Sequence, residues 1–304
     1  MKATILVGDV RQRLKDIPDN TVQACITSPP YWGLRDYGHD GQIGLEQSPA
    51  EYVAEMVAVF EEVRRVLKND GVLWLNLGDS YVGTGSKGNY KDPKYAEGRN
   101  GQTVALNNKV EGLKSKDLVG IPWRVAFALQ EAGWWLRQDI IWHKPNPMPE
   151  PVTDRCTKAH EYLFMLTKSS RYYFDNEPLK EPAIYAGDNR GARTDSRRGS
   201  KMNSMSGITG ETRNKRSVWT INTKPFKGAH FAVMPETLCE PPILATSREN
   251  DLILDPFTGS GTVATVALRH KRNYIGIELN PEYVQIAVNR ITDDQPLMNE
   301  VEVK

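Results

Sequence analysis

The sequence predicts a doubly wound, mainly parallel α/β sheet, and three observations support this. Short apolar runs alternate with amphipathic segments along most of the 304 residues, a pattern typical of parallel strands joined by crossover helices. Two of the apolar runs end abruptly, one at Pro29-Pro30 and one at Asp255-Pro256, because proline cannot continue a central strand. The composition, with 39% hydrophobic and 25% charged residues, is that of an ordinary globular protein.

The elements of the first half follow from apolar periodicity. Apolar residues at spacings of three and four predict a helix over residues 49–67, with Pro49 in its first turn and Asn69-Asp70-Gly71 ending it. A second helix is expected over residues 122–132. The expected strands are residues 3–7, 21–26, 72–77, 135–142 and 161–167.

The second half continues the alternation. Helices are expected over residues 235–245, 262–270 and 281–291, and strands over residues 252–254 and 274–278. Each strand is followed by a helix, which is the order that builds a parallel sheet with helices on both faces.

Two polar stretches interrupt this pattern. Residues 83–117 are expected to form a long mobile loop, which in a compact domain is often functional; the alternative is a plain surface insertion. Residues 187–228 hold ten Lys and Arg against three Asp and Glu, whereas residues 230–304 hold six against eleven. Such asymmetry indicates contact with a polyanion on one face, or else a solvated basic loop.

Several classes of protein are disfavoured. The three cysteines are far apart and odd in number, and neither they nor the five histidines cluster, so we expect no disulfide framework, no metal site and a reducing, cytoplasmic compartment. No apolar run approaches the roughly 20 residues that span a bilayer, and the start of the chain does not have the form of a signal peptide. We therefore expect no membrane association.

The segment from Leu252 to Asn280 has the layout of a nucleotide-binding βαβ unit. A buried strand ends at Asp255, the glycines of Gly259-Ser260-Gly261 permit a tight turn, and the next strand ends in Glu278, which can accept both hydroxyls of a ribose. A dinucleotide site is disfavoured, because the full glycine pattern fails at Pro256 and Ala264. A purely structural turn is the remaining alternative.

The segment Thr27-Ser28-Pro29-Pro30-Tyr31-Trp32 follows a strand at the same edge of the predicted sheet. An exocyclic amino nitrogen is a poor nucleophile, because its lone pair is delocalised into the ring. A side-chain oxygen and a rigidly held carbonyl can each accept one amino hydrogen and aim the lone pair at a methyl donor. Ser28 and Pro29 supply these groups, and an aromatic residue beyond them can stack on the base. A plain proline loop is the alternative.

At these two motifs the chain resembles the DNA amino-methyltransferases, which carry [DNS]-P-P-[YFW] at the catalytic loop and D-P-F-x-G-x-G at the cofactor loop. The resemblance covers nearly the whole chain, and the catalytic motif comes first, as in the β class of that family. It implies a methyltransferase sheet with a catalytic half at residues 1–170, a basic target-recognition insertion at 171–228 and a cofactor half at 229–304. Dimers are common in this class, so a homodimer is a further expectation.

The resemblance implies S-adenosylmethionine as cofactor and double-stranded DNA as substrate. The cofactor-binding residues it implies are Asp9, Thr27, His230, Phe231, Pro235, Asp255, Phe257, Gly259, Ser260, Gly261, Thr262, Glu278 and Asn280. The catalytic residues it implies are Ser28, Pro29, Pro30 and Tyr31, with Tyr31 and Trp32 stacking on the base. The residues expected to contact DNA are Lys144, Arg190, Arg193, Arg197, Arg198, Lys201, Arg213, Lys215 and Arg216. His160-Glu161 is also similar to the family, and we expect these two residues to be structural.

The implied reaction is direct methyl transfer to the amino nitrogen of a base that has left the helix stack. None of the three cysteines follows a proline, which disfavours the C5-cytosine enzymes and their Pro-Cys nucleophile. Ser28 favours N4 of cytosine, but N6 of adenine stays open. The alternative functions are a catalytically silent DNA-binding scaffold, which would not need both motifs intact, and an RNA or protein amide methyltransferase, in which the cofactor motif usually comes first.

Overall fold

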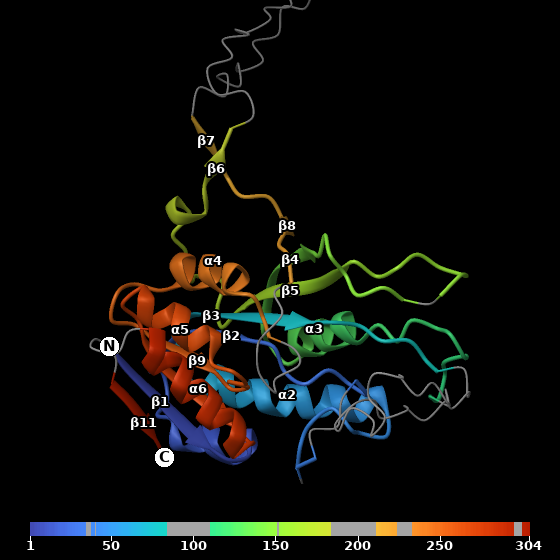
Figure 1. The fold of residues 1–304 in the computed structure, drawn as a ribbon, viewed down its shortest axis with the longest axis horizontal. Helices are drawn as coiled ribbons and strands as arrows, with labels where there is room; N and C mark the ends of the chain where they lie inside the picture. Colours follow the sequence, from blue (N-terminus) through green and yellow to red (C-terminus); the bar gives the residue numbers. More distant parts are fainter. Residues whose placement is uncertain are drawn as a thin grey trace, which may run out of the picture.

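A computed structural model describes residues 1–34, 38–39, 41–83, 110–150, 152–183, 211–223, 233–294 and 300–304. A twisted sheet runs through this part of the chain (Figure 1). Its strands, in spatial order, are β11 (Glu300–Val303), β1 (Lys2–Val7), β10 (Asn273–Glu278), β9 (Leu252–Asp255), β2 (Val22–Thr27), β3 (Leu67–Leu77), β5 (His160–Thr167), β4 (Trp135–His143) and β8 (Val218–Thr220). Only β5 runs antiparallel to its neighbours in this sheet. The mainly parallel, doubly wound α/β fold is therefore confirmed.

Helices cover both faces of the sheet (Figure 1). One face carries α1 (Val10–Arg13), α2 (Pro49–Val66) and α3 (Ile121–Glu131), and the other carries α4 (Glu236–Thr246), α5 (Thr262–Arg269) and α6 (Pro281–Asp294). Alternate residues of a strand point to opposite faces, so on β2 the side chain of Cys25 joins the first core and that of Ile26 joins the second.

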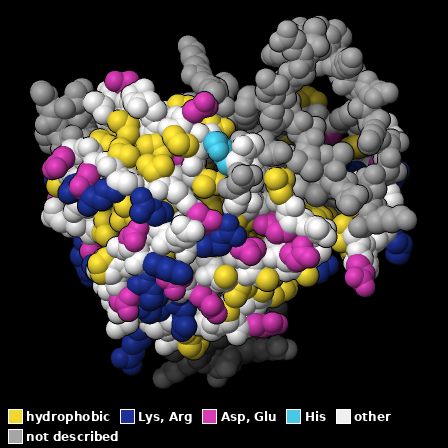
Figure 2. Space-filling model, turned by 90° about the horizontal axis from the view of Figure 1, so that it is seen from below, with side chains coloured by type: hydrophobic (Ala, Val, Ile, Leu, Met, Phe, Trp, Pro, Cys, Tyr) yellow, Lys and Arg dark blue, Asp and Glu magenta, His cyan; other side chains and the backbone are white. Residues whose placement is uncertain are grey.

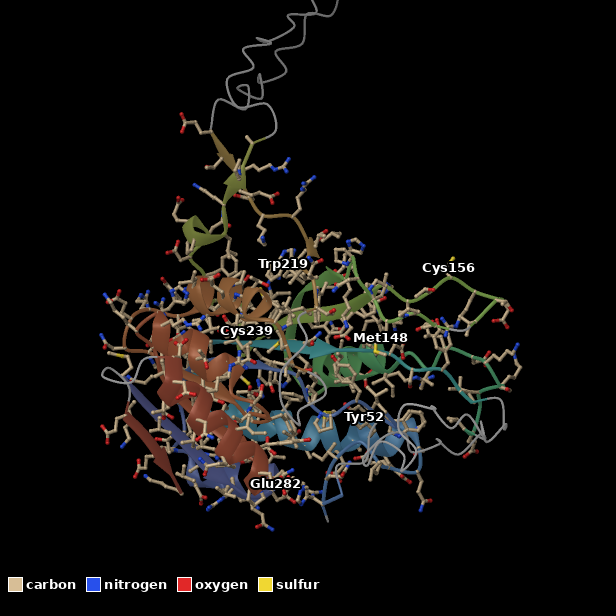
Figure 3. The ribbon with its side chains drawn as sticks, in the orientation of Figure 1. Tyr52, Met148, Cys156, Trp219, Cys239 and Glu282 are labelled. Atoms are coloured by element: carbon tan, nitrogen blue, oxygen red, sulfur yellow. The ribbon has the colours of Figure 1, made fainter. Side chains whose placement is uncertain are left out.

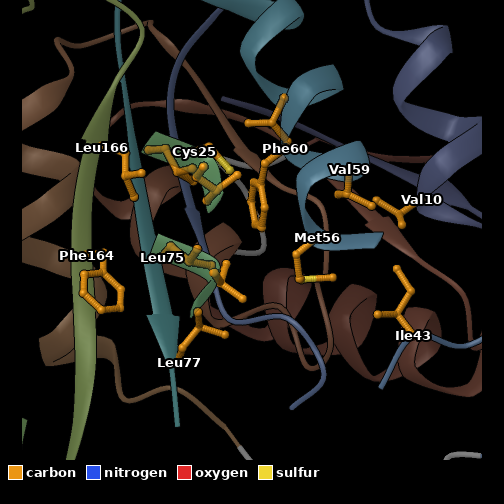
Figure 4. Close-up of a cluster of buried hydrophobic side chains, with 14 of the residues drawn as sticks. Val10, Cys25, Ile43, Met56, Val59, Phe60, Leu75, Leu77, Phe164 and Leu166 are labelled. Atoms are coloured by element: carbon orange, nitrogen blue, oxygen red, sulfur yellow. The ribbon is translucent and has the colours of Figure 1, made fainter. Parts of the chain in front are cut away.

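The first core is built from large side chains of α2 and the central strands (Figure 4). Met56 and Phe60 of α2 pack with Leu75 of β3 and Phe164 of β5, and all four side chains are fully buried. In an interior packed this densely, the loss of a single methylene group lowers the stability of the fold. The core therefore holds the strand ends, and the loops that follow them, in fixed positions.

Helix ends follow the expected local chemistry. Ser48 caps α2: its hydroxyl accepts a hydrogen bond from the backbone N–H of Glu51, whose carboxylate accepts one from the backbone N–H of Ser48. Pro49 occupies the first turn, as predicted. In α5 the preceding residue, Gly261, has a φ of +76°, a conformation that disfavours residues with a side chain.

The structure differs from the expected elements in several places. Strand β3 begins at Leu67 rather than at residue 72, because residues 67–71 continue its pairing with β2 through a register shift. The short strands β8 and β11 were not predicted, nor was the two-stranded ribbon of β6 (Glu181–Pro182) and β7 (Thr212–Arg213). This ribbon rises above α4, away from the sheet (Figure 1). The 3-10 turns η1 (Leu14–Asp16) and η2 (Glu177–Leu179) complete the elements.

The described surface carries both signs of charge, and the three cysteines do not pair with one another. On the face shown in Figure 2, acidic and basic side chains are interspersed. Cys25 is buried, as is Cys239, and Cys156 is exposed (Figure 3 labels the last two). All three are free thiols. Among the described residues, no helix is long and apolar enough to cross a membrane, and no cluster of His, Cys, Asp and Glu could hold a metal ion.

Candidate active site

A cleft of about 770 Å³ opens where the carboxyl ends of several parallel strands meet. The residues that follow β1, β2, β9 and β10 all line it, and so do residues of the segment between β4 and β5. Ligands bind at this edge in open α/β sheets. Two parts of its lining carry different chemistry: a carboxylate wall, defined by Asp9, Asp255 and Glu278, and a tyrosine wall, defined by Ser28, Tyr31, Lys144 and Glu161.

Asp255 is the most deeply buried acid of the carboxylate wall. Its Oδ1 accepts hydrogen bonds from the Thr27 hydroxyl at 2.7 Å and from the backbone N–H of Phe257 at 3.1 Å. Burial raises the pKa of Asp255 to about 7 despite these two donors. Near neutral pH this carboxyl group therefore titrates between its neutral and ionised forms.

Glu278 ends β10 and lies across the glycine turn. Its two oxygens accept from the backbone N–H groups of Gly259 at 2.8 Å and of Asn280 at 2.9 Å. Burial raises the pKa of Glu278 above its ordinary value, while these backbone donors oppose the rise. All these donors are neutral groups.

Asp9 differs from the other two acids because it has a cationic partner. Arg11 contacts both carboxylate oxygens of Asp9, and the hydrogen bonds from its side chain hold the pKa of Asp9 below the ordinary value. Arg11 also donates to the backbone carbonyl of Gly41 at 2.9 Å and to Glu55 at 3.2 Å. It therefore ties the carboxylate wall to the segment that follows Ser28-Pro29-Pro30-Tyr31.

The tyrosine wall centres on the hydroxyl of Tyr31. This hydroxyl lies 2.7 Å from Oε2 of Glu161, 3.1 Å from Oδ1 of Asn76 and 3.4 Å from Oγ of Ser28. Asn76 donates to the same Glu161 oxygen at 3.2 Å and to the carbonyl of Tyr162 at 3.0 Å. Burial and the charge of Glu161 raise the pKa of Tyr31 well above its ordinary value, so the phenol stays protonated.

Close packing holds the Tyr31 loop in place. A Cβ atom added to Gly78 would lie 2.6 Å from the Tyr31 ring, so only glycine permits the ring to approach β3 this closely. The hydroxyl of Tyr52, a buried residue of α2 (Figure 3), donates to the carbonyl of Pro30 at 2.9 Å. Trp32 donates to the carbonyl of Glu46 at 3.0 Å.

The expectation that Trp32 stacks on a base is corrected by its burial. Trp32 is only 2% exposed, belongs to the first core and does not line the cleft. Its indole N–H points back to the backbone and is satisfied there. The residue therefore anchors the loop, and Tyr31 alone of the two aromatic residues faces the cleft.

Two lysines contribute positive charge to the cleft. The ammonium group of Lys144 forms a salt bridge with Glu161 and lies 4.3 Å from the centre of the Trp142 ring. The ammonium group of Lys158 is buried and, among the described residues, has no hydrogen-bond partner. Burial lowers the pKa of Lys158. An unpartnered buried donor is costly unless a ligand supplies an acceptor.

Most of the predicted site residues meet in this cleft. The predicted residues that line it are Asp9, Ser28, Pro29, Pro30, Tyr31, Lys144, Asp255, Phe257, Gly259, Ser260, Thr262, Glu278 and Asn280. Among the described residues, three predicted cofactor residues do not line the cleft. Thr27 supports Asp255 from behind, Pro235 caps α4, and Gly261 packs against α6, where an added Cβ would lie 3.0 Å from that of Ala287.

Some predicted residues cannot be placed. His230, Phe231, Arg190, Arg193, Arg197, Arg198 and Lys201 lie outside the described residues, as does the loop over residues 84–109. Arg213 and Arg216 both contact Glu181 of the ribbon at 3.2 Å, and the ammonium group of Lys215 lies 5.1 Å from the centre of the Trp219 ring. The side chain of Arg216 is 67% exposed and that of Arg213 only 28%.

Sequence reasoning missed the network around Glu161. Asn76, Glu161 and Lys158 were not predicted as site residues, although all three line the cleft. They come from β3, β5 and the segment before β5, so only the folded sheet brings them together. The pair His160-Glu161 was noted in the sequence but was expected to be structural.

The residues of the cleft fit S-adenosylmethionine, the cofactor that the resemblance implies. That molecule carries positively charged sulfonium and amino groups, one carboxylate, a ribose and an adenine, and it is a cation overall. On the carboxylate wall, Asp255 and Glu278 are acids held by neutral donors, and the aromatic residue Phe257 also lines the cleft. Negative charge of this kind suits a cationic ligand.

Comparisons with known proteins agree with this arrangement. A family model described as DNA methylase matches residues 22–289. The type II methyltransferase M.Cfr9I of Citrobacter freundii is 50% identical over 95% of this chain and 87% of its own length. The type II methyltransferase M.SmaI of Serratia marcescens is 46% identical over 94% of this chain and 90% of its own length.

Solved structures show the same fold. A putative DNA modification methylase from Thermus thermophilus, complexed with S-adenosyl-L-methionine, is 25% identical, with a TM-score of 0.62 over 99% of this chain and 97% of its own. The cytosine-N4-specific PvuII DNA methyltransferase is 20% identical, with a TM-score of 0.65 over 99% of this chain and 95% of its own. From the match of the family model and the identity to type II methyltransferases, the chain belongs to the N6/N4 DNA methylase family and is an S-adenosylmethionine-dependent DNA methyltransferase.

Proposed function

We propose that this enzyme methylates the exocyclic amino nitrogen of a base that has been turned out of double-stranded DNA. One observation carries the proposal: Ser28 and Pro29 line the same cleft as Asp255 and Glu278. A group that activates an amino nitrogen and a surface suited to a cationic methyl donor therefore share one cavity. Direct transfer between two ligands needs this proximity.

The carboxylate wall would hold the cofactor, which supplies an electrophilic methyl group when it is bound. Glu278 would accept the ribose hydroxyls. Asp9 would lie near the adenine, and Asp255 would balance positive charge. The glycine turn at Gly259 allows the backbone to approach the ligand closely.

The tyrosine wall would hold and activate the base. The hydroxyl oxygen of Ser28 and the backbone carbonyl of Pro29 would each accept one hydrogen of the amino group, which leaves the nitrogen lone pair free for attack. Proline keeps this carbonyl rigid, and the Tyr52 hydroxyl restrains the next carbonyl, that of Pro30. The Tyr31 ring would stack on the extruded base.

Ser28 favours N4 of cytosine as the target over N6 of adenine. In the family that this chain resembles, serine at this position is more often found in N4-cytosine enzymes and aspartate in N6-adenine enzymes. Both amino groups present two hydrogens to the same pair of acceptors. The choice therefore depends on the rest of the base, where the unpartnered ammonium group of Lys158 offers a donor to a ring nitrogen or carbonyl oxygen.

The insertion at residues 171–228 is proposed as the target-recognition region, between the catalytic half (1–170) and the cofactor half (229–304). Part of it projects from the sheet as the β6–β7 ribbon (Figure 1), and β8 joins the edge of the sheet beside β4. Arg216, between β7 and β8, is exposed, as phosphate-binding residues must be. Lys144 would contact DNA at the cleft itself.

Identification of the methylated nucleoside tests the proposed function. The purified protein is incubated with methyl-labelled S-adenosylmethionine and unmethylated duplex DNA, and the DNA is digested to nucleosides. Label in N4-methylcytidine is expected. Label in N6-methyladenosine would keep the mechanism and reverse the base preference, whereas label in 5-methylcytidine would overturn it. Sedimentation of the same sample tests the expected homodimer.

A further inference from the structure

The hydrogen bonds around Tyr31 have a direction that bears on Ser28. A phenol has one hydrogen to donate. Glu161 lies 2.7 Å from the Tyr31 hydroxyl and Asn76 Oδ1 lies 3.1 Å from it, and both of these atoms are acceptors. The carboxylate is the nearer and the charged acceptor, and such bonds are about twice as strong as neutral ones. The Tyr31 hydrogen therefore points to Glu161.

The position of Asn76 supports this direction. Its amide nitrogen donates to Glu161 at 3.2 Å and to the carbonyl of Tyr162 at 3.0 Å. This arrangement turns the amide oxygen of Asn76 toward Tyr31. The Tyr31 hydroxyl thus faces two acceptors on one side, and its own lone pair is left for a donor on the other.

Ser28 is the donor on that other side. Its Oγ lies 3.4 Å from the Tyr31 hydroxyl, which fits a weak hydrogen bond donated by serine. When the Ser28 hydrogen points to Tyr31, the lone pairs of Ser28 remain available to the cleft that the residue lines. A substrate amino group needs such an acceptor and would be repelled by a hydrogen in the same place.

We propose that Glu161 is a positioning residue that keeps Ser28 in its acceptor state through the chain Ser28 O–H to Tyr31 O–H to Glu161 carboxylate. The inference rests on the proposed function of Ser28 as an acceptor for the target amino group. Lys144 holds the far oxygen of Glu161 in a salt bridge, and the two side chains are 17% and 16% exposed. The carboxylate is therefore fixed at both ends.

The substitution Glu161→Gln tests this direction with almost no change of shape. With one amide end held by Lys144 as an acceptor, the other end presents N–H to Tyr31. The phenol accepts that hydrogen and loses the carboxylate that fixed its own. Asn76, whose amide nitrogen donates to the same Glu161 oxygen, now meets a donor there and is no longer held with its oxygen toward Tyr31. The phenol hydrogen is then free to point to Ser28, in which case the Ser28 hydrogen turns into the cleft. We expect kcat to fall about 10- to 30-fold, the scale of one lost positioning interaction, with little change in KM for DNA.

The decisive experiment combines Glu161→Gln with Ser28→Ala. Single-turnover transfer of labelled methyl groups at excess enzyme measures even slow variants. If Glu161 acts through Ser28, then Glu161→Gln lowers the single-turnover rate about 10- to 30-fold when Ser28 is present. In the Ser28→Ala background, the same substitution lowers the rate less than about twofold. If Glu161→Gln costs the same factor in both backgrounds, the two residues act independently and the proposal is wrong.

Two controls separate this outcome from other causes. Glu249→Gln removes a carboxylate from an exposed ion pair with Lys271, remote from the cleft, and should leave all rates unchanged. Tyr31→Phe breaks the hydrogen-bond chain from Ser28 to Glu161 at its centre. It should lower the single-turnover rate at least as much as Glu161→Gln. If the wild-type enzyme labels an amino nitrogen but neither variant differs from it by more than about twofold, the positioning role fails while the proposed function stands. If the wild-type enzyme labels any other atom of the DNA, the proposed function itself is wrong.

Discussion

The two walls of the cleft balance their charge in different ways. On the carboxylate wall, Asp255 and Glu278 are held by backbone N–H groups and by a threonine hydroxyl. On the tyrosine wall, Glu161 is paired with the ammonium group of Lys144. Neutral donors leave the charge of a buried acid available to a ligand, whereas an ion pair cancels it.

This difference matches the two ligands that a DNA methyltransferase must hold. A cationic cofactor is favoured by uncancelled negative charge, and a neutral base is favoured by fixed dipoles without net charge. Asp9 is the exception on the carboxylate wall, because Arg11 neutralises it. Its proposed position near the adenine, the uncharged end of the cofactor, is consistent with that pairing.

Removal of the Ser28 hydroxyl should have the largest effect. Ser28→Ala takes away a proposed acceptor for the amino group, and the loss of one preorganised partner of a transition state typically lowers kcat about 10²- to 10³-fold. The Kd for S-adenosylmethionine should stay within about twofold, because the carboxylate wall is intact. Single-turnover kinetics and titration calorimetry measure the two quantities. A large loss of cofactor affinity would show that the walls are not separate.

Removal of the Asp255 charge should affect the other ligand. In Asp255→Asn the side-chain oxygen can still accept from Thr27 and Phe257, since both bonds go to Oδ1. Affinity for the cofactor should fall about 10- to 100-fold, the scale of one charge-assisted interaction. Calorimetry checks this, and unchanged affinity would remove Asp255 from the cofactor site.

The same variant should be more stable than the wild type. The pKa of Asp255 is about 7 in the fold and near 3.9 in an unfolded chain. Because the folded protein keeps this proton at a pH where the unfolded chain has lost it, the stability of the wild type falls as the pH rises from about 4 to about 7 and is constant above that range. The Tm advantage of Asp255→Asn should therefore grow between pH 5 and pH 7 and then level off at roughly 5 °C. A constant difference in scanning calorimetry would contradict the assigned titration.

In the wild type, the affinity for the cofactor should itself depend on pH, and this effect should be smaller than that of the Ser28→Ala substitution. With a pKa of about 7, Asp255 is mostly ionised at pH 8 and mostly protonated at pH 6. If the ionised form binds the cation, the cofactor affinity should fall roughly tenfold between pH 8 and pH 6. Asp255→Asn serves as the matched control, because it should remove most of this slope.

Removal of the Arg216 charge should have the smallest effect. Arg216→Ala removes an exposed guanidinium group from the proposed target-recognition region. DNA affinity should fall a few-fold, and the slope of log affinity against log salt should drop by about 1. Lys2→Ala, which removes an exposed charge from β1, toward the opposite end of the sheet from β8, is the control. An equal change in both variants would mean that Arg216 makes no specific contact.

The contiguous parts of this site could be predicted from the sequence. Ser28-Pro29 follows β2 directly and Asp255-Pro256 marks the end of β9, and parallel strands bring their carboxyl ends to one edge. The Glu161 network could not be predicted, because its members belong to strands that become neighbours only in the folded sheet. Trp32 was wrongly predicted to face the base, because adjacency to Tyr31 does not determine which ring turns inward.

The fold could be predicted where elements are long and periodic. The helix over residues 49–67 was expected almost to the residue, because its apolar stripe agrees with Pro49 at its start and Asn69-Asp70-Gly71 after its end. The strands β8 and β11 were missed, because three or four residues contain too little pattern to separate a strand from a loop. Tertiary pairing with β4 and β1 makes them strands.

The most direct test of two separate walls compares Asp255→Asn with Ser28→Ala at saturating S-adenosylmethionine. Single-turnover methyl transfer to duplex DNA is measured for both variants as the cofactor concentration is raised. The rate of Asp255→Asn should recover to within a few-fold of the wild type, because its defect lies in cofactor binding. The rate of Ser28→Ala should stay about 10²- to 10³-fold low, because its defect lies in activation of the base. Recovery of Ser28→Ala, or failure of Asp255→Asn to recover, would contradict the assignment of the two walls.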